Sequence, residues 1–146
     1  SLHDALPISG TVNSEGVIHS LSGMDYIFTP ISADRVVLES SLSFAVAIHK
    51  LLVKNEAYRL KGLHLFWNMV DGREKTDLYT LYEQTIGELE LPLMKVFIPD
   101  TKRFKKELDA QRKTVFRSTL FPADKRLVKG SNMEELITEI AYLIKL

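Results

Sequence analysis

Apolar residues in this chain follow two different patterns. Three short runs are almost continuously apolar and rich in β-branched and aromatic side chains, which is typical of strands covered on both faces. These runs cover residues 24–31, 61–70 and 92–98. Prolines lie at or just after the ends of the first and third runs, where a missing backbone N–H limits further pairing. The pattern therefore predicts three strands.

Between and after these runs, apolar residues recur at three- and four-residue steps, which is the pattern of amphipathic helices. It predicts helices at residues 33–55, 76–90, 102–111 and 131–144. The last helix begins with Ser131 and Glu134 at the spacing of a capping box, in which each side chain binds the other residue's backbone amide. Strands that alternate with helices predict an α/β fold, with a parallel sheet and helices on both faces.

The composition sets further limits on the fold and its chemistry. The 146 residues, 45% hydrophobic and 26% charged, suit one soluble domain with a real core. We find no apolar run of the ~18 residues that a membrane span needs. Cysteine is absent, which excludes disulfides, thiolate nucleophiles and cysteine-based zinc sites. The four histidines form no close pair and no HExxH motif, so no metal site is predicted.

The beginning of the chain differs from the remainder. Residues 1–9 have neither a helical nor a strand pattern, and Ser1–Ile8 resembles the translation of a sequencing adapter. They lack the basic and apolar regions of a secretory signal. We therefore expect residues 1–9 to be a foreign leader and residues 10–146 to be the native domain.

Charge is unevenly distributed, although the formal net charge is zero. Residues 102–130 contain ten lysines and arginines against three acidic residues. Such a segment is a candidate surface for DNA phosphates, and equally a solvated helix face. The candidate DNA contacts are Lys102, Arg103, Lys105, Lys106, Arg112, Lys113 and Arg117.

Five segments stand in an order and spacing that is more specific than any one of them alone. They are Gly10–Asn13, Asp25–Asp34, Leu65–Asp71, Val96–Asp100 and Phe116–Pro122. Together they resemble the later part of ParA/MinD-type P-loop ATPases (deviant Walker A, SIMIBI class), in particular ParA-like partition proteins of Bacteroidetes-type mobile elements. The resemblance covers residues 10–146. It implies a partial P-loop NTPase fold that lacks its N-terminal strands.

The resemblance also implies a function for the complete protein. That function is partition of plasmid or mobile-element DNA by a cytoplasmic ATPase that uses ATP and Mg²⁺. The implied partners are a second copy, non-specific DNA and a centromere-binding, ParB-like protein. No G-x-x-x-x-G-K-[ST] loop occurs in the 146 residues, so this chain is predicted to be inactive, with no catalytic residue and no bound cofactor.

By the same resemblance, the adenine-binding residues are Asn68, Asp71, Pro99 and Asp100, with Arg73 beside them. The Asn68 amide can both donate and accept a hydrogen bond, as an adenine edge requires. Each residue also has a purely structural interpretation. Asn68 and Asp71 suit a turn, and Asp100 suits the cap of the next helix. Gly10, Thr11 and Asn13 are the corresponding remnant of the switch region, or a frayed terminus.

Two other functions compete with the partition ATPase. A MinD-like membrane-cycling ATPase needs a basic amphipathic terminal helix, whereas the last helix carries Glu134, Glu135 and Glu139 with only Lys145 positive. A non-enzymatic DNA-binding or adaptor module needs no P-loop at all.

Overall fold

The computed structural model describes residues 15–73, 76–102, 123 and 125–145. They belong to two compact units, one within residues 1–66 and 75–94 and the other within residues 67–74 and 95–146. The remnant Gly10, Thr11 and Asn13 and most of the predicted basic helix at 102–111 lie outside the described residues.

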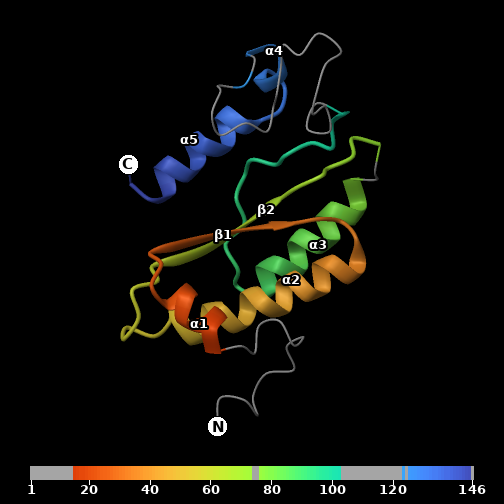
Figure 1. Ribbon diagram of the computed structural model, residues 1–146. Helices are drawn as coiled ribbons and strands as arrows, with labels where there is room; N and C mark the ends of the chain where they lie inside the picture. The colour runs from red at the N-terminus through yellow and green to blue at the C-terminus, as the bar shows by residue number, and fades with distance from the viewer. Residues whose placement is uncertain (1–14, 74–75, 103–122, 124, 146) are drawn as a thin grey trace. The chain divides into compact units, whose positions relative to one another are not determined.

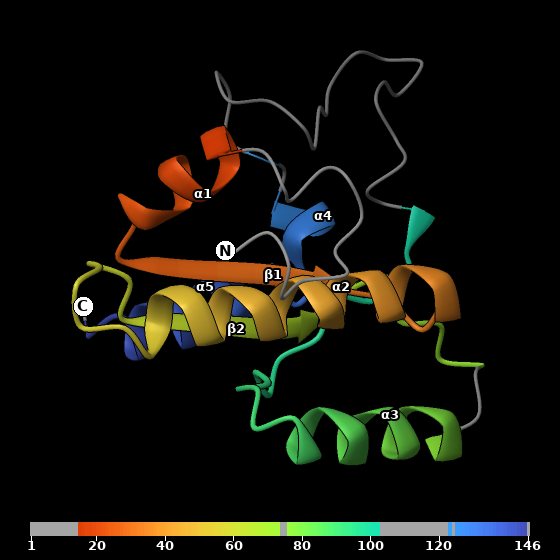
Figure 2. The ribbon, with the colours of Figure 1, turned by 90° about the horizontal axis from the view of Figure 1, so that it is seen from below.

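The first unit contains a small parallel sheet, as the alternation of strands and helices predicts. Strand β1 (Tyr26–Ile31) lies beside β2 (Gly62–Trp67), and Figure 2 shows both arrows pointing the same way. Helix α1 (Glu15–Ser22) precedes β1, and α3 (Thr76–Glu88) follows β2. The first two predicted strands and the predicted helix at 76–90 are therefore confirmed, whereas α1 was not expected.

Helix α2 (Arg35–Ile48) connects the two strands and lies against one face of them (Figures 1 and 2). Its apolar stripe is buried through Leu38, Leu42 and Ala45. On β2, Leu63 and Leu65 are fully buried, while His64 between them is half-buried, so alternate residues face the core. Burying each such leucine stabilises the fold by roughly 1.5–3 kcal/mol.

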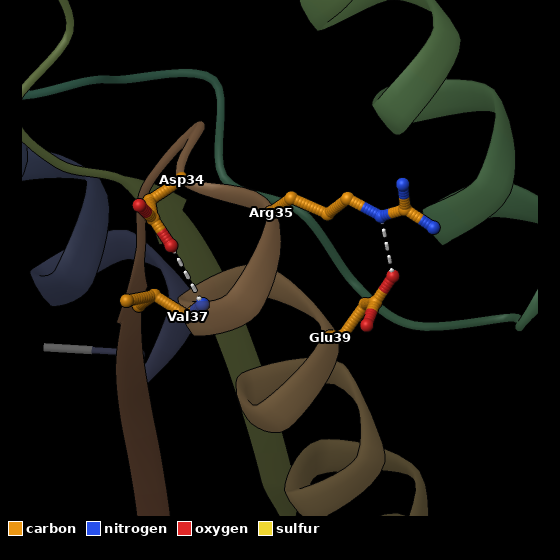
Figure 3. Close-up of polar contacts among 4 residues, drawn as sticks. All are labelled: Asp34, Arg35, Val37 and Glu39. Carbon is orange, nitrogen blue, oxygen red and sulfur yellow. Dashed lines mark hydrogen bonds and ion pairs between the residues drawn. The ribbon is translucent and has the colours of Figure 1, made fainter.

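The start of α2 is fixed by local hydrogen bonds, drawn in Figure 3. The Asp34 carboxylate accepts the backbone N–H of Val37 at 3.0 Å, which satisfies one of the amides that a helix leaves unpaired. One turn on, Arg35 Nε donates to Glu39 Oε1 at 3.0 Å. This second pair is exposed, so solvent screens it and it contributes little to stability.

The helix does not end at Ile48 but widens into a π-helical turn, η2 (His49–Val53). The Lys54 N–H bonds to the His49 carbonyl, five residues back. By length and composition alone, Arg35–Val53 is apolar enough to cross a membrane, which corrects the expectation that no segment reaches that length. The same composition is typical of a core helix, and α2 buries one side of this stretch.

The third predicted strand, 92–98, is only partly present. It forms two isolated parallel bridges, Leu65 with Leu93 in the first unit and Val70 with Pro99 in the second, rather than a continuous ladder. The intervening stretch is one residue longer on the 93–99 side, so the two segments cannot stay in register along their whole length.

The second unit contains α4 (Lys125–Val128) and α5 (Met133–Leu143). Helix α5 confirms the predicted last helix, but its capping box does not form. Asn132 is the N-cap, with φ of 60°, and makes no side-chain cap bond. Ser131 is fully buried, and its hydroxyl donates to the Val128 carbonyl at 2.6 Å while accepting the Met133 N–H at 3.3 Å. The serine hydroxyl therefore closes the preceding turn instead of meeting Glu134.

Candidate functional site

Two chain segments of the second unit bring the predicted base-binding residues together. Val70 donates its N–H to the Ile98 carbonyl at 3.0 Å, and its own carbonyl accepts the Asp100 N–H at 2.9 Å. Just before this bridge, the Ile98 N–H donates to the Trp67 carbonyl at 2.8 Å. Residues 68–71 and 98–100 are thus neighbours at the carboxyl end of β2.

The pairing of residues 98–100 with residues 67–70 is out of register with the pairing of Leu65 and Leu93. Leu65 accepts the Met94 N–H in the first unit, so a regular ladder brings the Val96 N–H to the Trp67 carbonyl. That carbonyl instead accepts the N–H of Ile98, two residues later. Lys95 and Val96 are looped out, and their amides need another acceptor.

Helix α5 supplies that acceptor. Both oxygens of the Glu139 carboxylate are used: Oε1 accepts the Lys95 N–H and Oε2 the Val96 N–H, each at 2.8 Å. At the start of the helix, Asn132 Nδ2 donates to the Phe97 carbonyl at 2.9 Å. Bonds from amides to a carboxylate are charge-assisted and stronger than neutral ones. Three backbone groups of segment 95–97 are therefore held by two side chains of α5 and its cap.

Asn68 is the residue of this site whose side chain is available. It is half-buried at the end of β2, and among the residues that the structure describes its amide has no hydrogen-bond partner. The structural interpretation required Asn68 to bond to the turn that follows. That role is taken by Asp71, whose Oδ1 accepts the Arg73 N–H at 2.9 Å. Asn68 can therefore offer a donor and an acceptor to a bound molecule.

Met69, beside Asn68, has a backbone conformation that is unusual for its residue type. Its φ is 53°, in the left-handed region, and its side chain is 57% exposed. The left-handed conformation costs a residue with a Cβ roughly 1–2 kcal/mol. It changes the direction of the chain between Trp67 and Val70, and so lets Val70 pair with Pro99.

The remaining predicted residues are placed as follows. Asp71 and Arg73 are exposed, and Asp71 closes the turn as its structural interpretation expects. Pro99 is half-buried opposite Val70, and the exposed Asp100 is tied to Val70 by its backbone. Phe97, just before this segment, is 43% exposed.

Of the candidate DNA contacts, only Lys102 lies within the described residues, where it is exposed. The others, from Arg103 to Arg117, lie outside them. In the described part of the chain, no group of three or more metal-ligating side chains occurs. The described residues of the site can recognise a molecule through hydrogen bonds and apolar contact.

Sequence reasoning missed Glu139, Asn132 and Met69 as parts of this site. Glu139 was interpreted only as one of three acidic residues that argue against membrane binding. Its position in α5, three residues after the buried Leu136, places it on the same side of the helix, and this was the available signal. Nothing in the sequence marks Met69, since glycine or asparagine is the usual residue at positive φ.

No protein-family model matches this sequence. A search of curated proteins also finds no match.

Proposed function

We propose that this chain is the base-recognition part of a ParA-type ATPase that partitions plasmid or mobile-element DNA. The supporting observation is the pairing of residues 68–71 with residues 98–100, which assembles Asn68, Asp71, Pro99 and Asp100 at the carboxyl end of β2. Asn68 reads the adenine edge through its unpaired amide, while Pro99 borders the base.

The remainder of the ATPase site comes, in this proposal, from sequence outside the 146 residues. A P-loop there holds the phosphates and Mg²⁺, which the residues of this chain do not provide. The longer cytoplasmic protein dimerises with ATP, binds DNA without sequence preference through the 102–117 segment and meets a ParB-like partner. The parallel arrangement of β1 and β2, with α2 against them, is compatible with this fold class.

Calorimetry with Mg·ATP tests the proposal. The 146-residue chain should show no micromolar binding, whereas a longer protein that includes the P-loop should bind. In that protein Asn68→Ala should weaken binding by about tenfold, since one or two hydrogen bonds to the base are removed. Asn55→Ala is the matched control, because the Asn55 side chain accepts only a local backbone N–H, that of Ala57. Micromolar binding by the 146 residues alone, or an Asn68→Ala protein that binds like the wild type, contradicts the proposal.

A non-enzymatic DNA-binding or adaptor module is the second candidate, since such a module needs no P-loop; the foreign leader expected at residues 1–9 argues against it, because it accounts for the missing motif in another way. The gene's upstream sequence separates the two. A P-loop strand and helix encoded in frame before residue 10 supports the ATPase, and a different domain there supports the adaptor.

A further inference from the structure

The Glu139 carboxylate accepts the backbone N–H groups of segment 95–97 that would otherwise bond to a neighbouring strand. The consecutive N–H groups of Lys95 and Val96 do not pair with β2. Each instead donates to one of the two carboxylate oxygens of Glu139. The Val96 amide is part-buried, and an amide left unpaired away from water costs about 1–3 kcal/mol, whereas the exposed Lys95 amide can bond to water if Glu139 is removed. Glu139 therefore stabilises the looped-out conformation, chiefly through the Val96 amide.

The contact is specific to Glu139 within its helix. Glu135 and Glu134, four and five positions earlier, are exposed, and their side chains make no hydrogen bond or ion pair within the part of the chain that the structure describes. Glu139 is half-buried and lies 44 residues after Lys95 in sequence. Asn132, at the start of the same helix, supports the same segment through the Phe97 carbonyl.

We infer that Glu139 is the positioning residue that sets the register of the base-recognition segment Ile98–Asp100, an inference that rests on the proposed function. Two registers compete for the carbonyl of Trp67. In the regular one, which continues the Leu65–Leu93 bridge, the Val96 amide occupies it; in the observed one, the Ile98 amide does. Glu139 removes Val96 from this competition by binding its amide.

Removal of this clamp, the pair of bonds from Glu139 to the Lys95 and Val96 amides, displaces the site. Return to the regular register moves the segment by two residues at the Trp67 carbonyl and by one residue at the Val70–Pro99 bridge, which is about 3–7 Å along a strand. Pro99 then no longer lies opposite Val70, and the Asp100 N–H no longer reaches the Val70 carbonyl. Asn68 and Asp71, which follow β2, stay in position, whereas Pro99 and Asp100 on the other segment are displaced.

Hydrogen exchange followed by mass spectrometry tests the clamp without any nucleotide. On the 146-residue chain at low micromolar concentration, Glu139→Ala should speed exchange in peptides covering residues 95–100 by at least about tenfold, because two charge-assisted bonds are removed. Glu139→Gln retains one carbonyl acceptor and should fall between the two. Glu135→Ala, on an exposed turn of the same helix, should match the wild type.

If Glu139 only stabilises the fold as a whole, the hydrogen-exchange experiment gives a different result. In that case exchange rises equally in α5 and in the sheet of the first unit, and Glu139→Gln gives no intermediate value. Either observation overturns the positioning role, as does unchanged exchange at residues 95–100. If Glu139→Ala does not fold, the comparison of Glu139→Gln with Glu135→Gln decides the same question.

The role in base recognition is tested in the longer, P-loop-containing protein. Glu139→Ala should reduce the ratio of Mg·ATP to Mg·GTP affinity by about tenfold, since one wall of the base site is displaced while phosphate contacts remain. An unchanged ratio, together with faster exchange at 95–100, refutes positioning of the base but leaves the clamp. A wild-type protein that binds no Mg·ATP refutes the proposed function itself, and the exchange result still decides the clamp.

Discussion

The ring of Phe28 on β1 stacks on the imidazole of His64 on β2, with centroids 5.5 Å apart and the ring planes inclined by 20°. The two strands therefore present these residues on the same face, opposite to the face that buries Leu63 and Leu65. Gly62 lies on this aromatic face as well, because a Cβ there comes within 3.0 Å of His64 Nε2 and 3.5 Å of Tyr26.

This stacking predicts a measurable coupling between the two strands. In a double-mutant cycle of Phe28→Leu and His64→Leu, the coupling free energy should be about 0.5–1.5 kcal/mol in favour of the native pair. Urea unfolding of the wild type, both single variants and the double variant supplies the four values. Additive effects of the two substitutions would show that the rings contribute burial alone.

The two glycines Gly130 and Gly87 should respond to alanine in opposite directions. Gly130 has φ of 77°, so Gly130→Ala forces a Cβ into the left-handed region and should destabilise the protein by roughly 1–2 kcal/mol. Gly87 lies within α3, and a Cβ there meets nothing within 4 Å. Gly87→Ala should therefore stabilise by about 0.5–1 kcal/mol. Thermal melts of both variants check the signs, and a decrease in stability at Gly87 contradicts the open space around it.

Stability should fall as the pH decreases through the titration of His49. Burial, helped by the charge of Lys54 and opposed by Glu90, lowers the pKa of His49 below its ordinary value of about 6.5. The unfolded chain then binds a proton more readily than the folded one, so stability is full above about pH 6.5 and declines below it.

Urea midpoints measured at about pH 7.5 and pH 5.5 test this dependence. His49→Gln should reduce the difference between the two midpoints, and Lys54→Gln should reduce it by a smaller amount, since burial is the larger cause. His19→Gln, on the exposed side of α1, is the control. An unchanged difference in the His49→Gln variant contradicts the assignment.

If the basic segment binds DNA in the longer protein, affinity for duplex should be independent of sequence and should decline steeply with salt. Replacing Lys102, Lys105 and Lys106 together with alanine should lower the salt slope by up to about three, because each lysine bound to a phosphate contributes about one. Fluorescence anisotropy with a labelled duplex at several salt concentrations measures this. If the affinity and the salt slope are unchanged, these lysines are not part of the DNA-binding surface.

Much of the first unit follows from periodicity. Strands β1 and β2 and helices α2 and α3 lie within a few residues of the predicted bounds, because each buries part of a regular apolar pattern. Helix α1 was not predicted. It has only eight residues, and its apolar positions Val17, Ile18 and Leu21 are too few to stand out as a helical pattern in the sequence.

The second unit was harder to predict because its geometry depends on distant residues. The third strand is interrupted by amides that bind Glu139, which lies 43 residues after Val96, and no local pattern reveals such a partner. Ser131 and Glu134 have the spacing of a capping box, but the box does not form. The buried Ser131 hydroxyl donates to the Val128 carbonyl instead. Asn68 was identified only through resemblance to a family, and only the structure showed that its amide has no hydrogen-bond partner among the described residues.

The clamp on segment 95–97 has a consequence for how the chain is made. Translation proceeds from the N-terminus, so Lys95 and Val96 leave the ribosome 44 and 43 residues ahead of Glu139, a delay of roughly 2–9 s at about 5–20 residues per second. During that interval the nascent segment is free to settle in the regular register against β2. The pairing of Ile98 with Trp67 is therefore completed last, and a chain that stops before α5 lacks the two oxygens that accept the Lys95 and Val96 amides.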